Sequence, residues 1–259
     1  MATRNCTVIK IGGSLLERKN FDALVRGLAA YLRRHKTLLV HGGGKEVSAL
    51  AEQFGIKSTF VNGRRYTDER MMTIVEMALS GKVNPYLVGR LNALGVSALG
   101  LSGRDGNLVS ARKISSLGCV GIPSKIKLES IRRLLALGDV PVFSSIASDG
   151  KGGALNVNAD EMAGALARSL KASRLILFTD VPGILDPAKK TIPHINRKTA
   201  EGLIREGVIS GGMIPKVRSA LSALEKGVQE VWILEGRVPL AKARGTLVSN
   251  QPLRRQPFS

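Results

Sequence analysis

Short apolar runs alternate along this chain with longer segments in which apolar residues recur every three or four positions. The short runs predict strands at residues 8–11, 37–41, 97–101, 108–112, 140–144, 175–179 and 228–234. The longer segments predict helices at residues 46–53, 69–79, 83–94, 128–137, 160–170, 197–206 and 214–226. Because strands alternate with helices of this length, the pattern predicts an α/β fold: an open, mostly parallel central sheet with helices on both faces.

A further helix is predicted after the first strand, and its ends carry residue types that favour them. Asn20 is the predicted N-cap, and the basic run at residues 33–36 suits the last turn. Between these ends, apolar residues recur at helical spacing at Phe21, Leu24, Val25, Leu28 and Leu32. The segment therefore predicts a helix that buries one face against the sheet.

The length of 259 residues predicts a single domain, since one hydrophobic core stops growing near roughly 250 to 300 residues. The composition is 44% hydrophobic but only 4% aromatic, which favours the aliphatic interior of a buried parallel sheet. A soft boundary near Lys171 predicts two lobes within residues 1–259. Only the last ten residues, with Arg254, Arg255 and Pro257, are predicted to form a frayed tail.

The sequence carries no signal for a membrane or an oxidising compartment. No run approaches the roughly 18 apolar residues that a membrane span needs, and the first ten residues lead directly into a strand pattern. Cys6 and Cys119 are the only cysteines, too few and too far apart for a disulfide framework or a zinc site. We therefore expect a cytoplasmic protein.

The charge balance is strongly basic, with 39 lysines and arginines against 20 aspartates and glutamates and a net charge of +19. Such a charge attracts anions, and nucleic acid, an acidic protein partner and ATP are all compatible with it. A basic nucleic-acid-binding protein is the alternative from another class, supported by pairs such as Arg33 and Arg34. Only ten aromatic residues are present and no recognised nucleic-acid motif occurs, so the sequence disfavours this alternative.

Two glycine-rich turns follow the first two predicted strands. The first is Lys10-Ile11-Gly12-Gly13-Ser14 and the second is His41-Gly42-Gly43-Gly44. Because the carboxyl ends of parallel strands meet at one edge of a sheet, both turns are expected there, with backbone N–H groups free to approach an anion. The spacing matches neither a Walker P-loop nor a dinucleotide-binding motif.

Two later segments add charged candidates. Lys216 lies in the first turn of a predicted helix, after two glycines, where its charge would point toward an anion. Asp160 opens another predicted helix after Asn156 and Asn158, which are spaced two residues apart. Taken alone, Lys216 would be a surface lysine and Asp160 a simple N-cap, so neither segment identifies a site without the others.

Taken together and in order, these segments resemble the amino acid kinase family, and among its members the kinases that phosphorylate N-acetylglutamate. The matching segments are residues 9–15 (IKIGGSL), 40–44 (VHGGG), 61–68 (VNGRRYTD), 100–106 (GLSGRDG), 156–160 (NVNAD), 179–185 (TDVPGIL) and 211–217 (GGMIPKV). The resemblance implies a carbamate kinase-like three-layer sandwich. It also implies transfer of the γ-phosphoryl group of ATP to a carboxylate in arginine biosynthesis.

The resemblance also implies roles for individual residues. The catalytic set is Lys10, Lys216 and Asp160, with the aspartate holding the two lysines. The acceptor set is Gly43, Gly44, Arg65 and Asn156. The ATP set is Lys10, Gly12, Gly13, Asp180, Val181, Pro182, Gly183, Ile184, Leu185, Val208, Ile209, Ser210 and Lys216. Magnesium would be held largely by the ATP oxygens, without a metal site of the protein, and positioning and electrostatics would supply most of the catalysis.

By the same resemblance, residues up to about 171 would form the acceptor-binding and dimerisation lobe, and residues from about 172 the ATP-binding lobe. The first strand begins near Cys6, which leaves no room for the long N-terminal helix of arginine-inhibited hexamers. A homodimer without that feedback is therefore expected.

Some positions depart from the pattern of N-acetylglutamate kinases. Lys45 and Pro85 replace a proline and a lysine that are common in the family, and Tyr66 replaces a valine. Tyr66 matches the related kinase that acts on aminoadipate attached to an acidic carrier protein. That carrier-bound acceptor, of aminoadipate or glutamate, stays the alternative. Kinases for carbamate, aspartate, glutamate or nucleotide monophosphates are disfavoured by residues 62–65 and 156–160.

Overall fold

The computed structural model describes residues 6–13, 21–61, 63–236 and 243–251. The predicted N-cap Asn20 and the predicted tail residues Arg254, Arg255 and Pro257 lie outside these ranges, as do parts of two of the matching segments, residues 14–15 and 62.

An eight-stranded sheet runs through the middle of the molecule in the order β12-β14-β13-β11-β1-β2-β8-β5. Its strands are β1 (Thr7–Ile11), β2 (Thr37–His41), β5 (Ala98–Ser102), β8 (Val140–Ser144), β11 (Arg174–Thr179), β12 (His194–Ile195), β13 (Glu230–Glu235) and β14 (Gly245–Val248). Neighbouring strands are parallel except β13 and β14. The predicted open, mostly parallel sheet is therefore confirmed.

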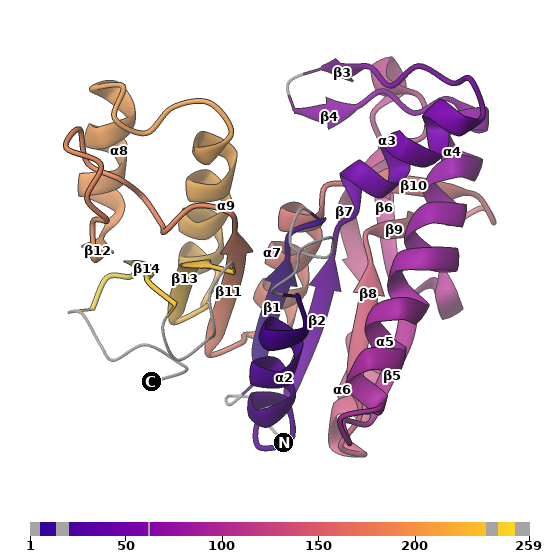
Figure 1. Cartoon of the computed structure of the whole chain (residues 1–259), viewed down its shortest axis with the longest axis horizontal. Coiled ribbons are helices and arrows are strands. Elements are labelled where there is room, and N and C mark those ends of the chain that lie inside the picture. The colour runs from indigo at the N-terminus through magenta and orange to yellow at the C-terminus, as the bar shows by residue number, and fades with distance from the viewer. Residues whose placement is uncertain (1–5, 14–20, 62, 237–242, 252–259) are drawn as a thin grey trace.

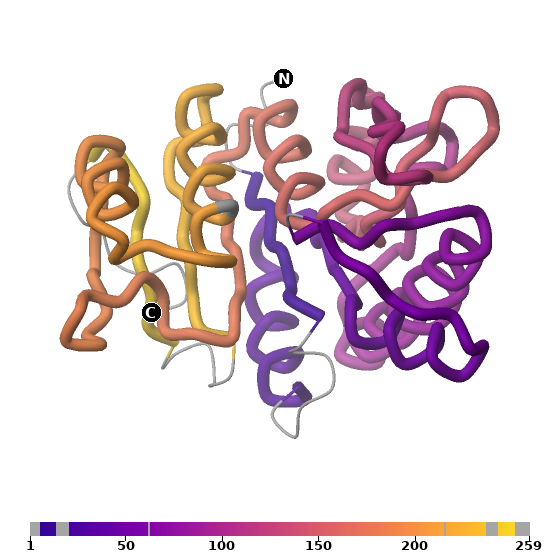
Figure 2. The backbone as a smooth tube through the Cα atoms, turned by 90° about the horizontal axis from the view of Figure 1, so that it is seen from above, coloured from indigo at the N-terminus to yellow at the C-terminus, as the bar shows by residue number. Residues whose placement is uncertain are grey.

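Helices cover both faces of this sheet (Figures 1 and 2). One face carries α6 (Leu128–Ala136), α7 (Ala159–Leu170), α8 (Arg197–Arg205) and α9 (Met213–Glu225), and the other carries α2 (Phe21–Leu32) and α5 (Asn84–Asn92). Alternate residues of each strand enter the two cores. In β1, Val8 faces the first helix layer and Ile9 and Ile11 face the second. This alternation turns Lys10 toward the layer of α7 and α9.

A smaller unit adjoins the β8 and β5 side of the sheet. It contains a closed four-stranded sheet of β6 (Val109–Lys113), β7 (Val120–Ile126), β9 (Ile146–Ser148) and β10 (Ala154–Val157), and a hairpin of β3 (Phe60–Val61) and β4 (Arg64–Arg65). Helices α3 (Gly44–Gln53) and α4 (Glu69–Glu76) and the short 3-10 turns η2 (Asp105–Asn107) and η3 (Ser115–Leu117) complete it. The predicted strand at residues 108–112 is therefore present as β6, but it pairs outside the central sheet.

The two predicted helices at residues 69–79 and 83–94 form one continuous helical segment. A π-helical stretch, η1 (Met77–Val83), joins α4 to α5 without a break. The predicted gap between them is wrong: Pro85 lies two residues after the π-helical stretch ends at Val83, and the helical backbone continues through it. The wider π turn carries the chain past Gly81, and such turns occur frequently at functional sites.

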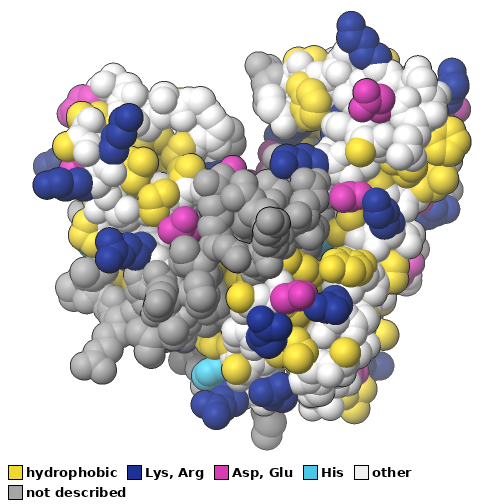
Figure 3. Space-filling view, in the orientation of Figure 1, with side chains coloured by type: hydrophobic (Ala, Val, Ile, Leu, Met, Phe, Trp, Pro, Cys, Tyr) yellow, Lys and Arg dark blue, Asp and Glu magenta, His cyan; other side chains and the backbone are white. Residues whose placement is uncertain are grey.

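The charge of the surface is distributed over many elements. On the face shown in Figure 3, lysine and arginine side chains lie in several separate groups with acidic side chains between them. This part of the described surface therefore offers no continuous basic track for a nucleic-acid strand. Among the described residues, no helix is both long and apolar enough to cross a membrane.

Candidate active site

The two glycine turns meet at the carboxyl edge of the central sheet. The Gly42 N–H donates to the Ile11 carbonyl at 3.3 Å, which ties the end of β2 to the end of β1. A Cβ atom on Gly13 would lie 2.8 Å from the Cα of Gly43, so only glycine allows the two backbones to approach this closely. The expectation that both turns share one edge is confirmed.

A buried histidine supports the second turn from below. His41 is fully buried, and burial lowers its pKa to about 4, so the imidazole is neutral at pH 7. Its Nδ1–H donates to the Gly42 carbonyl at 2.9 Å, which leaves Nε2 to accept from the Asn84 amide at 3.0 Å. Asn84 also donates to the Val142 carbonyl at 2.8 Å. Sequence reasoning missed this role of Asn84, because its partners are far away along the chain.

Lys10, Asp160 and Lys216 form one buried charge cluster. The Lys10 ammonium lies 2.9 Å from Oδ1 of Asp160, and the Lys216 ammonium lies 2.6 Å from Oδ2. The three side chains are only 9%, 14% and 21% exposed. They come from β1, from the first turn of α7 and from the first turns of α9, which the sheet alternation and the packing of α7 on α9 bring together. The structure thus joins all three predicted catalytic residues.

The ionisation of this cluster follows from burial and from its mutual contacts. Burial alone would raise the pKa of Asp160, but Lys10 and Lys216 more than offset it and hold the pKa of the carboxyl well below its usual range. Burial also lowers the pKa of Lys10, and the charge of Asp160 works against that decrease. Two cations therefore share one anion, which leaves an excess positive charge at the sheet edge.

Asp160 is not the N-cap of its helix. The cap is Asn158, whose Oδ1 accepts from the N–H groups of Asp160 and Glu161 at 2.9 and 3.2 Å. Asp160 is two residues further along, at the second position of the helix, and its side chain contacts the two lysines. The interpretation of Asp160 as a helix cap is therefore wrong, and its contacts with Lys10 and Lys216 favour the functional interpretation.

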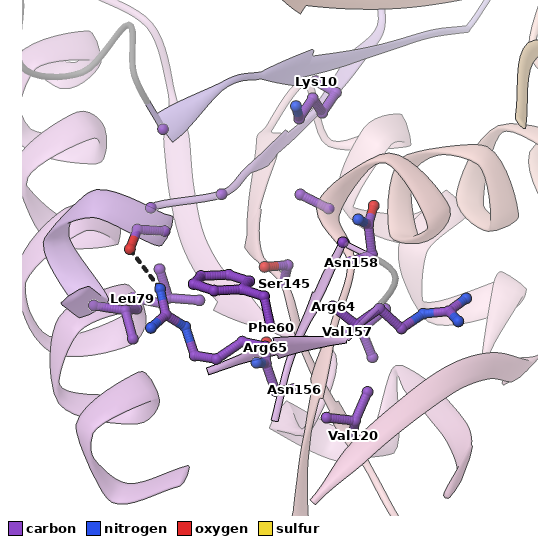
Figure 4. A pocket seen from close by; sticks show the side chains of 17 residues that line it. Lys10, Phe60, Arg64, Arg65, Leu79, Val120, Ser145, Asn156, Val157 and Asn158 are labelled. Carbon is purple, nitrogen blue, oxygen red and sulfur yellow. Dashed lines mark hydrogen bonds between the residues drawn. The ribbon is translucent and has the colours of Figure 1, made fainter. Parts of the chain in front are cut away.

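A cleft of about 230 Å³ opens beside this cluster, under the β3–β4 hairpin (Figure 4). All four predicted acceptor residues, Gly43, Gly44, Arg65 and Asn156, line it together with Lys10 and Gly13. Apolar side chains complete the wall at Val47, Phe60, Leu79, Val120 and Val157. The cleft is therefore small, partly apolar and positive at two ends.

Arg65 is buried without an ion-pair partner among the described residues, and only 6% of it is exposed. Its guanidinium donates to the Gly44 carbonyl at 2.7 Å, to Ser48 at 2.8 Å and to Ser58, and it stacks on the Phe60 ring at 4.7 Å. All of these partners are neutral, and burial lowers the pKa of Arg65. A desolvated cation among neutral acceptors favours an anionic ligand in the cleft.

The predicted ATP segments lie outside this cleft, at the ends of neighbouring elements. Residues 180–185 follow β11, which pairs directly with β1, and residues 208–210 precede α9. The first loop is fixed by Thr246, whose hydroxyl accepts from the Ile184 N–H at 2.8 Å. The side chains of Ile184 and Ile209 are both buried in the core. Only the backbone of these two residues can therefore face a ligand.

The fold and this charge cluster define a phosphotransferase of one family. The model of the amino acid kinase family matches residues 5–235, and the chain belongs to that family. An acetylglutamate kinase of Endomicrobium trichonymphae is 43% identical over 93% of this chain and 98% of its own length. An acetylglutamate kinase of Rhodopseudomonas palustris strain BisB18 is 46% identical over 90% of this chain and 84% of its own length.

Solved structures agree with the fold. The crystal structure of smu.665 from Streptococcus mutans UA159 matches with a TM-score of 0.84 at 30% identity, covering 96% of this chain and all of that chain. The carbamate kinase of Giardia lamblia bound to AMP-PNP matches with a TM-score of 0.69 at 16% identity, over 97% of this chain and 100% of that chain. At that identity, the second match supports the three-layer fold alone.

Proposed function

We propose that this protein transfers the γ-phosphoryl group of ATP to the γ-carboxylate of N-acetyl-L-glutamate, forming N-acetyl-L-glutamyl 5-phosphate in the second step of arginine biosynthesis. The observation that carries the proposal is the position of Arg65, a buried cation without a carboxylate partner among the described residues, in the same cleft as Lys10 and the glycine turns. An acceptor with two carboxylates and a small acyl group suits such a cleft. The relatives named acetylglutamate kinase support the same acceptor.

The chemistry requires no proton transfer by the protein, because a glutamate-type carboxylate is ionised at pH 7. An oxygen of the acceptor carboxylate attacks the γ-phosphorus as the bond between that phosphorus and the bridging oxygen breaks. ADP then leaves with the electron pair. Lys10 and Lys216 stabilise the charge on the transferring oxygens, and Asp160 fixes both ammonium groups. The N–H groups of the two glycine turns supply further donors.

The acceptor is held at three points. Arg65 binds its α-carboxylate, and Gly43 and Gly44 bind the reacting end. Asn156 binds the amide; its own side chain is positioned by a hydrogen bond to Thr67 at 3.1 Å. Together these contacts hold the carboxylate in line with the phosphorus, which is the main contribution that a protein makes to this reaction.

ATP is the co-substrate and binds along residues 180–185 and 208–210, with its phosphates directed at Lys10, Gly12, Gly13 and Lys216. Both oxygens of Asp160 contact lysines, so in this proposal the carboxylate positions the two ammonium groups. Among the described residues, no group of three or more His, Cys, Asp or Glu side chains could hold a metal ion. In this proposal Mg²⁺ would be held largely by phosphate oxygens, where it would neutralise charge on the transferring group.

The two functions divide along the chain near residue 171. The residues that line the cleft all lie between Lys10 and Ala159, whereas α8, α9 and β11 to β14 follow the division. In this proposal, residues up to about 171 bind the acceptor and residues from about 172 bind the nucleotide, while Lys10, Gly12 and Gly13 of the first part contact the ATP phosphates. The space-filling view shows the molecule hollowed between these parts, with α9 on one side and the β3–β4 hairpin on the other (Figure 3).

The protein forms a homodimer through the outer edge of β5 in this proposal. This strand ends the sheet order, and Leu99 on it is 41% exposed. Met77 and Tyr86, on the adjoining helical segment, are 45% and 50% exposed. A sheet edge that has no partner strand in the described part of the chain and lies beside apolar side chains favours pairing with a second copy. Light scattering after gel filtration tests this, and Leu99→Arg with Tyr86→Arg is expected to give a monomer.

A cytoplasmic location goes with this biosynthetic role, and both cysteines are free thiols. The decisive experiment measures ATP consumption with Mg²⁺ and traps the acyl phosphate with hydroxylamine. The acceptors compared are N-acetylglutamate, glutamate, aspartate, carbamate and N-acetyl-aminoadipate. Selective turnover of N-acetylglutamate supports the proposal. Silence with every free acceptor would refute it and favour an acceptor that is bound to an acidic carrier protein.

A further inference from the structure

Two adjacent arginines anchor the β3–β4 hairpin on opposite sides of the cleft. Successive side chains of a strand point to opposite faces, and Figure 4 shows Arg64 and Arg65 directed away from each other. Arg65 reaches α3 through the Gly44 carbonyl and Ser48. Arg64 reaches α7 through an ion pair with Glu161. The hairpin therefore spans the cleft, with Arg65 in contact with α3 on one side and Arg64 in contact with α7 on the other.

The ion-pair partner of Arg64 lies in the first turn of α7, which also carries Asp160 of the charge cluster. Glu161 follows Asp160 directly, and both N–H groups are capped by Asn158. The side chains of Arg64 and Glu161 are 29% and 30% exposed, so the pair is partly accessible to solvent, and neither residue belongs to a hydrophobic core. Because the pair lies at the border of the cleft, its opening would change the space that is available to a ligand.

A second cavity of about 460 Å³ lies on the other side of the pair. Three of its lining residues, Gly63, Arg64 and Asn158, also line the acceptor cleft, so these residues form a common wall. Among the described residues, the charged side chains that line the second cavity are Arg64, Glu161, Arg168 and Arg218. Three cations face one anion there, and Ser219 and Ser222 add hydroxyl groups.

The positions of the two carboxylates of the proposed acceptor determine which of its groups faces this wall. The reacting carboxylate faces Lys10 and the glycine turns, and the other carboxylate faces Arg65, on the side of α3. The remaining side of the cleft is the wall with Val120, Val157 and Arg64, so the N-acyl group faces it. Resting on the proposed function, this placement brings the end of the acyl group to the Arg64–Glu161 pair.

We propose that the Arg64–Glu161 ion pair is a specificity gate, which closes the acceptor cleft to acyl groups longer than acetyl. When the pair opens, the cleft joins the second cavity, and a longer N-acyl group extends into it. Arg168 and Arg218 then favour acyl groups that end in a carboxylate. Arg64 and Glu161 are thus positioning residues that select the length of the acceptor and take no part in phosphoryl transfer.

The test compares kcat/KM for N-acetylglutamate, N-hexanoylglutamate and N-succinylglutamate in the wild-type enzyme and in variants. Arg64→Ala is expected to raise the ratio of either long acceptor to N-acetylglutamate by about tenfold or more, since pocket length alone discriminates to this extent. Glu161→Gln, which keeps the shape but removes the charge, is expected to shift the ratio in the same direction. Arg64→Lys preserves the ion pair and is expected to keep the wild-type ratio.

Two further variants distinguish the effect of cavity length from the effect of cavity charge, and both from the general effect of losing an exposed ion pair. Adding Arg218→Ala to Arg64→Ala is expected to reduce the gain for N-succinylglutamate and to leave the gain for N-hexanoylglutamate. Arg90→Ala breaks an exposed ion pair with Asp22, on other helices, and serves as the matched control with an unchanged ratio. Unchanged ratios in both Arg64→Ala and Glu161→Gln, with N-acetylglutamate still phosphorylated, would overturn the gate. A wild-type enzyme without activity on N-acetylglutamate would overturn the proposed function, and the gate with it.

Discussion

Replacing Asp160 by asparagine tests the charge cluster most directly, because it removes the carboxylate that Lys10 and Lys216 share. The amide keeps the shape of the side chain and one acceptor oxygen, but it carries no charge. Both contacts are short, 2.9 and 2.6 Å, and Lys10 is almost completely buried. Removing one member of a buried ion pair costs about 3 to 5 kcal/mol. Because Lys216 is partly exposed and the amide oxygen still accepts one hydrogen bond, we expect a loss near the lower limit, about 3 kcal/mol.

The same substitution has opposite effects on binding and on chemistry. In the variant, the two ammonium groups repel each other until an anion replaces the lost charge. The phosphates of a bound nucleotide therefore relieve more electrostatic repulsion in the variant than in the wild type. ATP is therefore expected to raise the unfolding free energy of the variant more than that of the wild type, and KM for ATP should not increase. The turnover number is expected to fall by about 100-fold, because the lysines lose their fixed positions in the transition state.

Urea unfolding with and without Mg-ATP gives the first quantity, and steady-state kinetics with N-acetylglutamate gives the second. Asp22→Asn is the matched control, since it changes a carboxylate to an amide in an exposed ion pair and should cost less than about 1 kcal/mol. An Asp160→Asn enzyme with wild-type stability and full turnover would refute the assignment of Asp160 as the anchor of both lysines. A larger KM for ATP at unchanged turnover would show that the cluster serves binding alone.

Three further changes test other parts of the site. Lys216→Ala should lower kcat by about 100-fold or more with the fold intact by circular dichroism, and a fully active variant would refute its role. Arg65→Ala should raise KM for the acceptor by roughly 10- to 100-fold, as expected for a lost charged hydrogen bond, whereas an increase confined to KM for ATP would contradict the placement of the acceptor. His41 has a folded pKa of about 4, below the unfolded value of 6.5, so the unfolded state binds more protons between these values and stability falls as pH decreases through them, by about 3 kcal/mol at most. His41→Gln should flatten this part of the curve of unfolding free energy against pH, and an equal slope in both proteins would exclude His41 as its source.

The central sheet could be predicted because each of its five- and six-residue strands is an apolar run that is bounded by helical segments. The strands of the smaller sheet could not be predicted in the same way. β7 contains Pro123, which normally argues against a strand, and the structure accommodates it next to a register shift between Ser110 and Ala111 in β6. β10 has only four residues, and one of its two partners, β7, is distant in sequence, so its polar alternation looked equally like a turn.

The helix break predicted near Gly81 shows a local rule overridden by packing. Glycine and proline within five residues favour a break, yet Leu79 and Val83 are both buried in the π-helical stretch. A Cβ atom on Gly43 would lie 2.6 Å from Leu79 and 3.3 Å from Val83. The helix therefore continues because its side chains fill the space that a glycine of the anion-binding turn leaves open, and this contact was not visible in the local sequence.

The catalytic cluster depends on a relation that no single segment contains. Each of Lys10, Asp160 and Lys216 has an ordinary interpretation alone, and their order along the chain supplied the prediction. They are brought together by the alternation of side chains along β1. Lys10 faces α7 and α9 only because Ile9 and Ile11 face the opposite core. A shift of one residue would turn Lys10 into that apolar core and place isoleucine against Asp160. The burial that fixes the sheet register therefore also fixes the charge that the proposed reaction needs.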